Sequence, residues 1–87
     1  MARYNILFRK SAVKELEKIS QPHLGKIINR IQTLANDPGP AGCEKLSESD
    51  KYRIRQGRYR IVYSIQDKEL TIWVVKIGHR KDIYQKL

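Results

Sequence analysis

Residues 51–66 read KYRIRQGRYRIVYSIQ, and this stretch decides the expected fold. Its two halves, 51–56 and 59–66, alternate large apolar residues with polar ones, which is typical of β-strands. The connection between them, Gln56-Gly57-Arg58, is short enough for a hairpin. The sequence therefore predicts a pair of antiparallel strands joined by a tight turn.

Alternation also assigns the side chains of this hairpin to two faces. The residues expected to face a hydrophobic core are Tyr52, Ile54, Tyr59, Ile61, Tyr63 and Ile65. The opposite face would then present Arg53, Arg55 and Arg60 together. A solvated surface usually mixes charges of both signs, whereas these three have no interleaved acid, and arginine suits bidentate contact with phosphate. We interpret this second face as an anion-binding surface.

The rest of the chain is expected to complete an α+β fold. Residues 4–8 and 70–78 predict further strands, the latter extending the hairpin into an antiparallel meander. Amphipathic helices are predicted over 12–19, capped by Ser11, and over about 22–36. The expected architecture is two N-terminal helices packed on an antiparallel sheet of about four strands, with 40–50 as a loop and a short C-terminal helix or tail.

Length and composition restrict the kinds of site. The 87 residues predict one domain, residues 1–87. The single cysteine, Cys43, cannot form an internal disulfide, and no Cys/His cluster has zinc-ligand spacing, so neither a metal nor another cofactor is expected. The N-terminal apolar run is too short for a signal peptide, and no stretch approaches the ~20 apolar residues that cross a bilayer. These features predict a cytoplasmic protein.

The net charge points to a polyanionic partner. Eighteen Lys and Arg residues against nine Asp and Glu residues give a formal charge of +9 and a pI near 9.9. Nucleic acid, an acidic protein and a membrane surface would each be attracted by such a charge. Charge alone does not choose among these three.

A second group of candidate residues follows the last predicted strand: Gly78-His79-Arg80, and then Tyr84. Each has a structural explanation of its own, as a strand-ending glycine, an exposed histidine and arginine, or a tyrosine packed on the core. However, pairing of this strand beside 59–66 would bring Arg80 near Arg60, and histidine is the side-chain type best suited to exchange a proton near neutral pH. We therefore expect the two groups to converge.

Two segments carry a resemblance to a known family: 59–63, YRIVY, and 77–84, IGHRKDIY. With the two preceding helices, they make the whole chain resemble the RelE/ParE superfamily of toxins from type II toxin–antitoxin systems. RelE-type members are messenger-RNA endoribonucleases that cut codons in the ribosomal A site, whereas ParE-type members poison DNA gyrase. The combination of arginines and the C-terminal tyrosine is closer to the RelE-type branch.

The resemblance implies metal-free chemistry in which the ribose 2′-OH attacks the adjacent phosphate and leaves a 2′,3′-cyclic phosphate. Arg60, with Arg53 or Arg55, would hold the phosphate, and Arg80 would stabilise or protonate the leaving oxygen. Tyr84 would hold the nucleotide in line. RelE members commonly have lysines in place of Arg53 and Arg55, and arginine keeps its proton, so His79 is the candidate base. Further RNA contacts are expected from Lys51, Arg58 and Lys45.

The resemblance also implies partners. A cognate antitoxin would bind the toxin, the ribosome and mRNA would be its targets, operator DNA would be bound only through the antitoxin complex, and no membrane would be involved. Three alternatives stay open: a gyrase-poisoning toxin without nuclease activity, a degenerate toxin that only binds its antitoxin, and a plain nucleic-acid-binding module.

Overall fold

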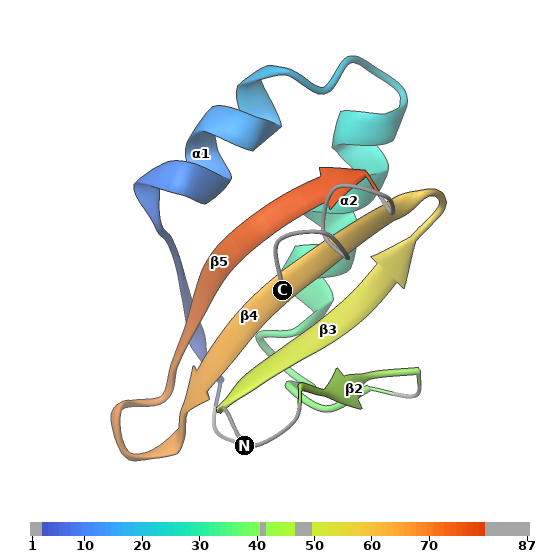
Figure 1. The fold of residues 1–87 in the computed structure, drawn as a ribbon. Coiled ribbons are helices and arrows are strands. Elements are labelled where there is room, and N and C mark those ends of the chain that lie inside the picture. Colours follow the sequence, from blue (N-terminus) through green and yellow to red (C-terminus); the bar gives the residue numbers. More distant parts are fainter. Residues whose placement is uncertain (1–2, 41, 47–49, 80–87) are drawn as a thin grey trace.

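The computed structural model describes residues 3–40, 42–46 and 50–79 (Figure 1). In chain order the elements are β1 (Asn5–Phe8), α1 (Lys10–Glu17), α2 (His23–Thr33), β2 (Glu44–Lys45), β3 (Lys51–Gln56), β4 (Tyr59–Gln66), the 3-10 turn η1 (Asp67–Glu69) and β5 (Thr71–His79). The predicted α+β class is confirmed. The predicted C-terminal helix or tail lies outside the described residues.

The sheet has five strands in the order β1-β5-β4-β3-β2. Strands β3, β4 and β5 form the predicted antiparallel meander, but β1 pairs with β5 in parallel, and β2 adds a short antiparallel edge beside β3. The sheet is therefore mixed and not purely antiparallel, and its five strands are slightly more than the predicted number of about four. No turn signals the pairing of β1 with β5, because these strands are far apart in the sequence. The two residues of β2 have no apolar alternation.

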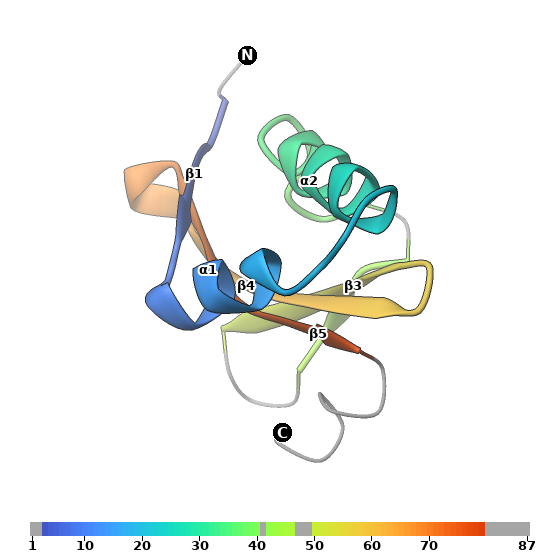
Figure 2. The ribbon, with the colours of Figure 1, turned by 90° about the horizontal axis from the view of Figure 1, so that it is seen from above.

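Both helices lie on one face of the sheet, and no helix formed by the described residues covers the other face (Figure 2). The helices bury Ala12, Ile27 and Ile31 in this layer, and the residues just after them add Ile19 and Leu34. The sheet meets them with Ile54, Ile61, Tyr63, Ile72, Val74 and Ile77. Burying each large aliphatic side chain contributes roughly 1.5–3 kcal/mol. Neither described helix is long and apolar enough to cross a membrane.

The first helix starts earlier than the sequence predicts. It begins at Lys10, and Arg9, without a side-chain cap, precedes it. Ser11 is therefore inside the first turn and is not the predicted capping residue; its hydroxyl donates instead to the Val75 carbonyl at 2.9 Å. This hydrogen bond gives the serine hydroxyl an acceptor and the strand carbonyl a donor. It also connects α1 to β5.

A β-bulge in β5 changes which side chains face the helices. Val62 of β4 pairs with Lys76, but the next residue, Tyr63, pairs with Val74, so that Val75 is an extra residue. Because strand side chains alternate, one extra residue exchanges the two faces beyond it. Ile72 and Val74 face the helices before the bulge, and Ile77 and His79 face them after it, whereas Lys76 and Gly78 turn to the second face.

Gly57 determines the turn between β3 and β4. Gln56 pairs with Tyr59 across a two-residue loop, and Gly57, the first loop residue, has φ of 61°. A side chain here is strained by the backbone conformation, although no atom lies within 4 Å of the position a Cβ would take. We expect Gly57→Ala to lower the free energy of unfolding by about 1–2 kcal/mol. Urea denaturation would measure this.

Gly39 provides the matched control, since a Cβ there also meets nothing within 4 Å and the backbone is not left-handed. Gly39→Ala is expected to leave the unfolding midpoint unchanged or slightly raised. Equal effects of the two substitutions would contradict the assignment of the cost to the backbone of Gly57.

Candidate nucleic-acid interface

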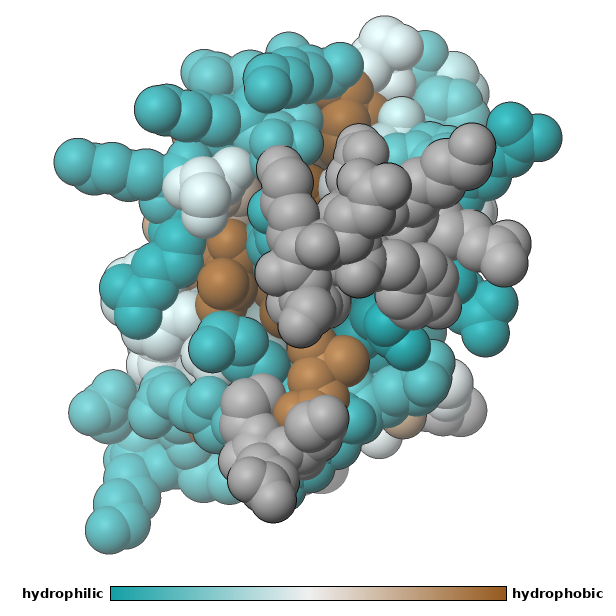
Figure 3. Space-filling model, in the orientation of Figure 1, coloured by the Kyte–Doolittle hydropathy of each residue, from teal (hydrophilic) through white to brown (hydrophobic). Residues whose placement is uncertain are grey.

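The predicted arginines come together on the sheet face that the helices leave uncovered. Arg55 of β3 pairs directly with Arg60 of β4, and Arg53 pairs with Val62 two residues along. Cross-strand partners point to the same side of a sheet, so all three arginines belong to one face, which we call the arginine face. Like charges in directly opposite positions repel, so a bound anion would relieve an unfavourable arrangement. Figure 3 views this side of the molecule and shows hydrophilic side chains around its rim.

The three arginines differ in exposure. Arg60 retains 3% of its accessible surface and is buried, whereas Arg55 is exposed to solvent. Arg53 has 13% of its side chain exposed and forms an ion pair with Glu44, with 3.2 Å between Nη2 and Oε2. Arg55 is therefore the arginine that a phosphate can reach directly. The burial of Arg60 places its charge beneath the surface of this face.

Glu44 is a component of this face that the sequence did not predict. It lies on β2, within the stretch expected to be a loop, and pairs with Arg53. About half of the Glu44 side chain is exposed, so the ion pair contributes roughly 0–1 kcal/mol to stability. Such a weak bond could be exchanged for one to an anion.

Other predicted contacts divide between the two sides of the sheet. Lys51 pairs with Ser64 and lies on the arginine face, and the bulge adds Lys76, which the sequence analysis missed. Lys45 pairs with Tyr52, which packs against the core, so it lies toward the other side. Arg58 is exposed in the hairpin turn.

His79 does not join the arginine face. It pairs with Tyr59 on the side facing the helices, and the two rings meet edge to face at 5.9 Å. Strict alternation along β5 would have placed His79 on the side of Trp73, next to Arg60, but the bulge reverses the assignment. Arg60 instead has Gly78 as its partner on β5. The expected convergence with Arg80 and Tyr84 falls outside the described residues.

A buried tyrosine connects the sheet to the segment after α2. The Tyr63 hydroxyl donates to the Pro38 carbonyl at 2.7 Å, and the Cys43 sulfur lies 3.2 Å from the same oxygen. Because the phenol has only one proton, the Cys43 thiol is the donor in the second bond. Burial raises the pKa of Tyr63, so this tyrosine stays neutral. We assign Tyr63 and Cys43 a structural role.

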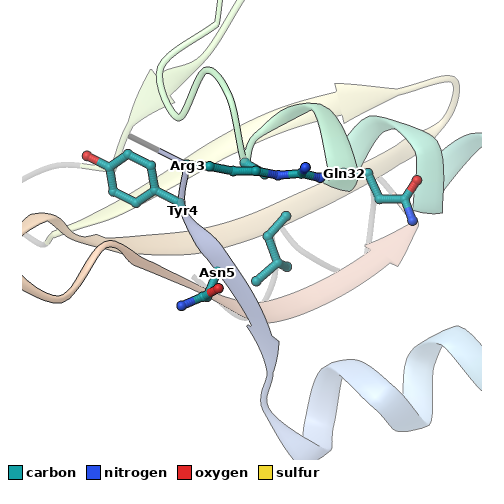
Figure 4. Close-up of a pocket in the computed structure, with 6 residues that line it drawn as sticks. Arg3, Tyr4, Asn5 and Gln32 are labelled. Carbon is teal, nitrogen blue, oxygen red and sulfur yellow. The ribbon is translucent and has the colours of Figure 1, made fainter. Parts of the chain in front are cut away.

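A pocket of about 460 Å³ lies away from the arginine face, lined by Arg3, Tyr4, Asn5, Ile6, Gln32 and Ala35 (Figure 4). Arg3 extends toward Gln32 of α2, while Tyr4 points away from it. The Tyr4 hydroxyl donates to Asp67 at 2.6 Å, and this bond raises the pKa of Tyr4. The pocket brings together none of the predicted site residues.

Comparison with known proteins decides the family. A family model described as "ParE toxin of type II toxin-antitoxin system, parDE" matches residues 6–84. The chain belongs to this toxin family. The resemblance carried by 59–63 and 77–84 is thereby confirmed.

Relatives of this toxin have RelE-type names. This chain is 29% identical over 86 residues to a putative RelE-like toxin protein of Escherichia coli, and the match covers 94% of this chain and 90% of the E. coli protein. The archaeal RelE–RelB complex from Pyrococcus horikoshii has 27% identity and a TM-score of 0.77, over 90% of this chain and 96% of that one. A chain of the RelBE2 complex from Mycobacterium tuberculosis matches with a TM-score of 0.82 at 24% identity. The match covers 92% of this chain and 94% of that chain, and it supports the fold described above.

Proposed function

We propose that this toxin stops translation by cutting messenger RNA, as the resemblance to RelE-type toxins implies. The observation that carries the proposal is the arginine face: Arg55 is exposed and pairs directly with Arg60, and both helices pack on the other side of the sheet. An exposed guanidinium group directly opposite a second, buried one suits a phosphodiester and the charge that develops on it. The RelE-type names of the relatives favour RNA as the substrate.

In the proposed reaction the ribose O2′ forms a bond to phosphorus and the bond to O5′ breaks. The 2′-OH proton passes to water, and O5′ takes up a proton from water and leaves as a hydroxyl group. Arg55 binds a non-bridging phosphate oxygen, Arg53 joins it after leaving Glu44, and the buried charge of Arg60 adds to the potential beneath them. Arg80 and Tyr84 keep roles that the resemblance implies: Arg80 supplies positive charge at O5′, and Tyr84 positions the nucleotide.

Of the groups that this reaction needs, a general base for the 2′-OH is the one that the described residues supply least well. Arginine does not lose its proton, and His79 faces the helices on the opposite side of the sheet from Arg55. We therefore infer that the toxin acts mainly by positioning and charge stabilisation, and that the ribosome supplies the remaining orientation. Activity on free RNA should then be weak compared with activity on a translated message.

The proposed partner is a cognate antitoxin, as in the complexes of the solved relatives. A chain of charge +9 would attract an acidic, partly disordered segment, which would neutralise the surface that binds RNA. Binding to operator DNA would occur only through the antitoxin complex. We expect both proteins in the cytoplasm, without a membrane partner.

A second function, inhibition of DNA gyrase, is favoured by the name of the matching family. Primer extension on cellular mRNAs after brief induction distinguishes mRNA cleavage from inhibition of DNA gyrase. The proposal predicts cuts confined to translated frames, with plasmid supercoiling unchanged. Growth arrest with intact mRNA and cleaved or relaxed DNA would establish the gyrase activity instead, and intact mRNA without arrest would indicate a degenerate toxin.

A further inference from the structure

Three aromatic rings gather at the hairpin end of the sheet, on the side that faces the helices. The rings of His23 and Tyr59 have centroids 5.8 Å apart at 47°, and those of Tyr59 and His79 are 5.9 Å apart at 74°. Both histidines are exposed, and Tyr59 is half-buried between them. Three elements thus contribute to this cluster: the start of α2, the start of β4 and the end of β5.

A pocket of about 190 Å³ opens beside this cluster, lined by His23, Lys26, Gln56, Gly57, Arg58 and Tyr59. Lys26 and Arg58 are exposed, and none of these six described residues is acidic. The volume is below the roughly 300–1,000 Å³ typical of sites that enclose a small molecule. A pocket of this size can therefore hold one flat ring of a ligand against its wall, while the rest of the ligand stays outside.

We propose that this pocket, which we call the hairpin pocket, binds one nucleotide of a single-stranded RNA. Its base would stack on His23 or Tyr59 and its phosphate would contact Lys26 and Arg58. An acidic peptide would need the two cations but not the rings, whereas unpaired bases are recognised by stacking on aromatic side chains, including histidine. The inference deepens the proposed function and rests on it for the identity of the ligand as RNA.

The hairpin pocket lies next to the arginine face along the chain but opens on the other side of the sheet. Tyr59 directly precedes Arg60, and Gln56 directly follows Arg55. A strand of RNA that bends over the β3–β4 turn would therefore contact Arg55 on one side and the rings on the other. The hairpin pocket would add affinity and base preference for a nucleotide near the cut, without contacting the reacting atoms.

The test uses the purified full chain and two probes. Fluorescence anisotropy measures binding of a labelled single-stranded RNA hexamer, and NMR follows the ring signals of His23 and His79 during titration with AMP. The double variant His23→Ala/Lys26→Ala is expected to bind the hexamer about fivefold more weakly or worse, because loss of one stacked base costs about that much. Both residues are exposed, so the fold should persist. Lys14→Ala, an exposed lysine on α1, is the matched control and should bind as the wild type does.

Movement of both histidine signals with AMP, together with weaker hexamer binding by the double variant alone, would support the site. Unchanged hexamer binding by the double variant, or histidine signals unmoved by AMP, would overturn it. Displacement of AMP by a poly-glutamate peptide at lower concentration than by the hexamer would also overturn it in favour of an acidic protein. If AMP moves the histidine signals but the wild type cuts no message, the proposed function fails while the nucleotide site stands.

Discussion

Arg55→Ala is expected to slow cleavage of a ribosome-bound message by about 10²–10³-fold, the usual effect of removing one donor that stabilises transition-state charge. Arg55 is the exposed arginine of the pair formed with Arg60, so its removal takes away direct contact with the phosphate. Because the side chain is exposed, the unfolding transition should be unchanged. Single-turnover cleavage on programmed ribosomes would measure the rate.

Arg3→Ala supplies the control, since Arg3 is also an exposed arginine but lies beside β1 and α2, away from the arginine face. It should cut at the wild-type rate. Arg55→Lys keeps the charge but loses the planar fork, and an intermediate rate is expected. A rate for Arg55→Ala within about threefold of the Arg3→Ala rate would contradict the placement of the phosphate at Arg55.

Ile61→Ala is expected to lower the free energy of unfolding by about 2–5 kcal/mol. Ile61 is 0% exposed in β4, with Ile54 on one side and Ile77 on the other, so truncation leaves a cavity where three strands meet. A domain of this size has a total stability on the order of 5–15 kcal/mol, and the variant would lose a large part of it. Urea denaturation at constant m-value would measure the change.

Val13→Ala is the matched control, because Val13 is an aliphatic residue with 42% exposure on α1. Its effect should stay within about 0.5 kcal/mol. Equal losses for the two variants would mean that the sheet and helices do not form the core around Ile61.

The part of the fold that the sequence predicts best is the hairpin 51–66. Alternation there placed Ile54 and Ile61 in the core and Arg53, Arg55 and Arg60 on the other face, as the structure has them. Local pattern suffices in this segment because a short turn determines the register of the two strands.

Features that depend on distant contacts were not predictable in the same way. The parallel pairing of β1 with β5 joins strands with no turn between them, and β2 is too short to show a pattern. The bulge at Val75 has no local sequence signal, yet it turns Lys76 toward the arginine face and His79 away from it. A single extra residue thus explains why the candidate base and the arginines are on different sides.

Burial also separated residues that looked alike in the sequence. Arg53, Arg55 and Arg60 are equivalent by alternation, but Glu44 engages Arg53, and Arg60 is buried. Pairing with an acid from another strand and depth within the sheet are properties of the assembled fold. The ion pair and the burial together leave Arg55 as the arginine that a ligand can contact directly.

The measurement that tests the account most directly is the mapping of 5′-hydroxyl ends on mRNA after brief induction, comparing wild type with Arg55→Ala and Arg3→Ala. Attack by the 2′-OH releases a 5′-hydroxyl end, so we expect such ends within translated frames for wild type and Arg3→Ala, and their near absence for Arg55→Ala. Growth arrest by the wild type without new 5′-hydroxyl ends, or equal numbers of them in all three strains, would contradict it.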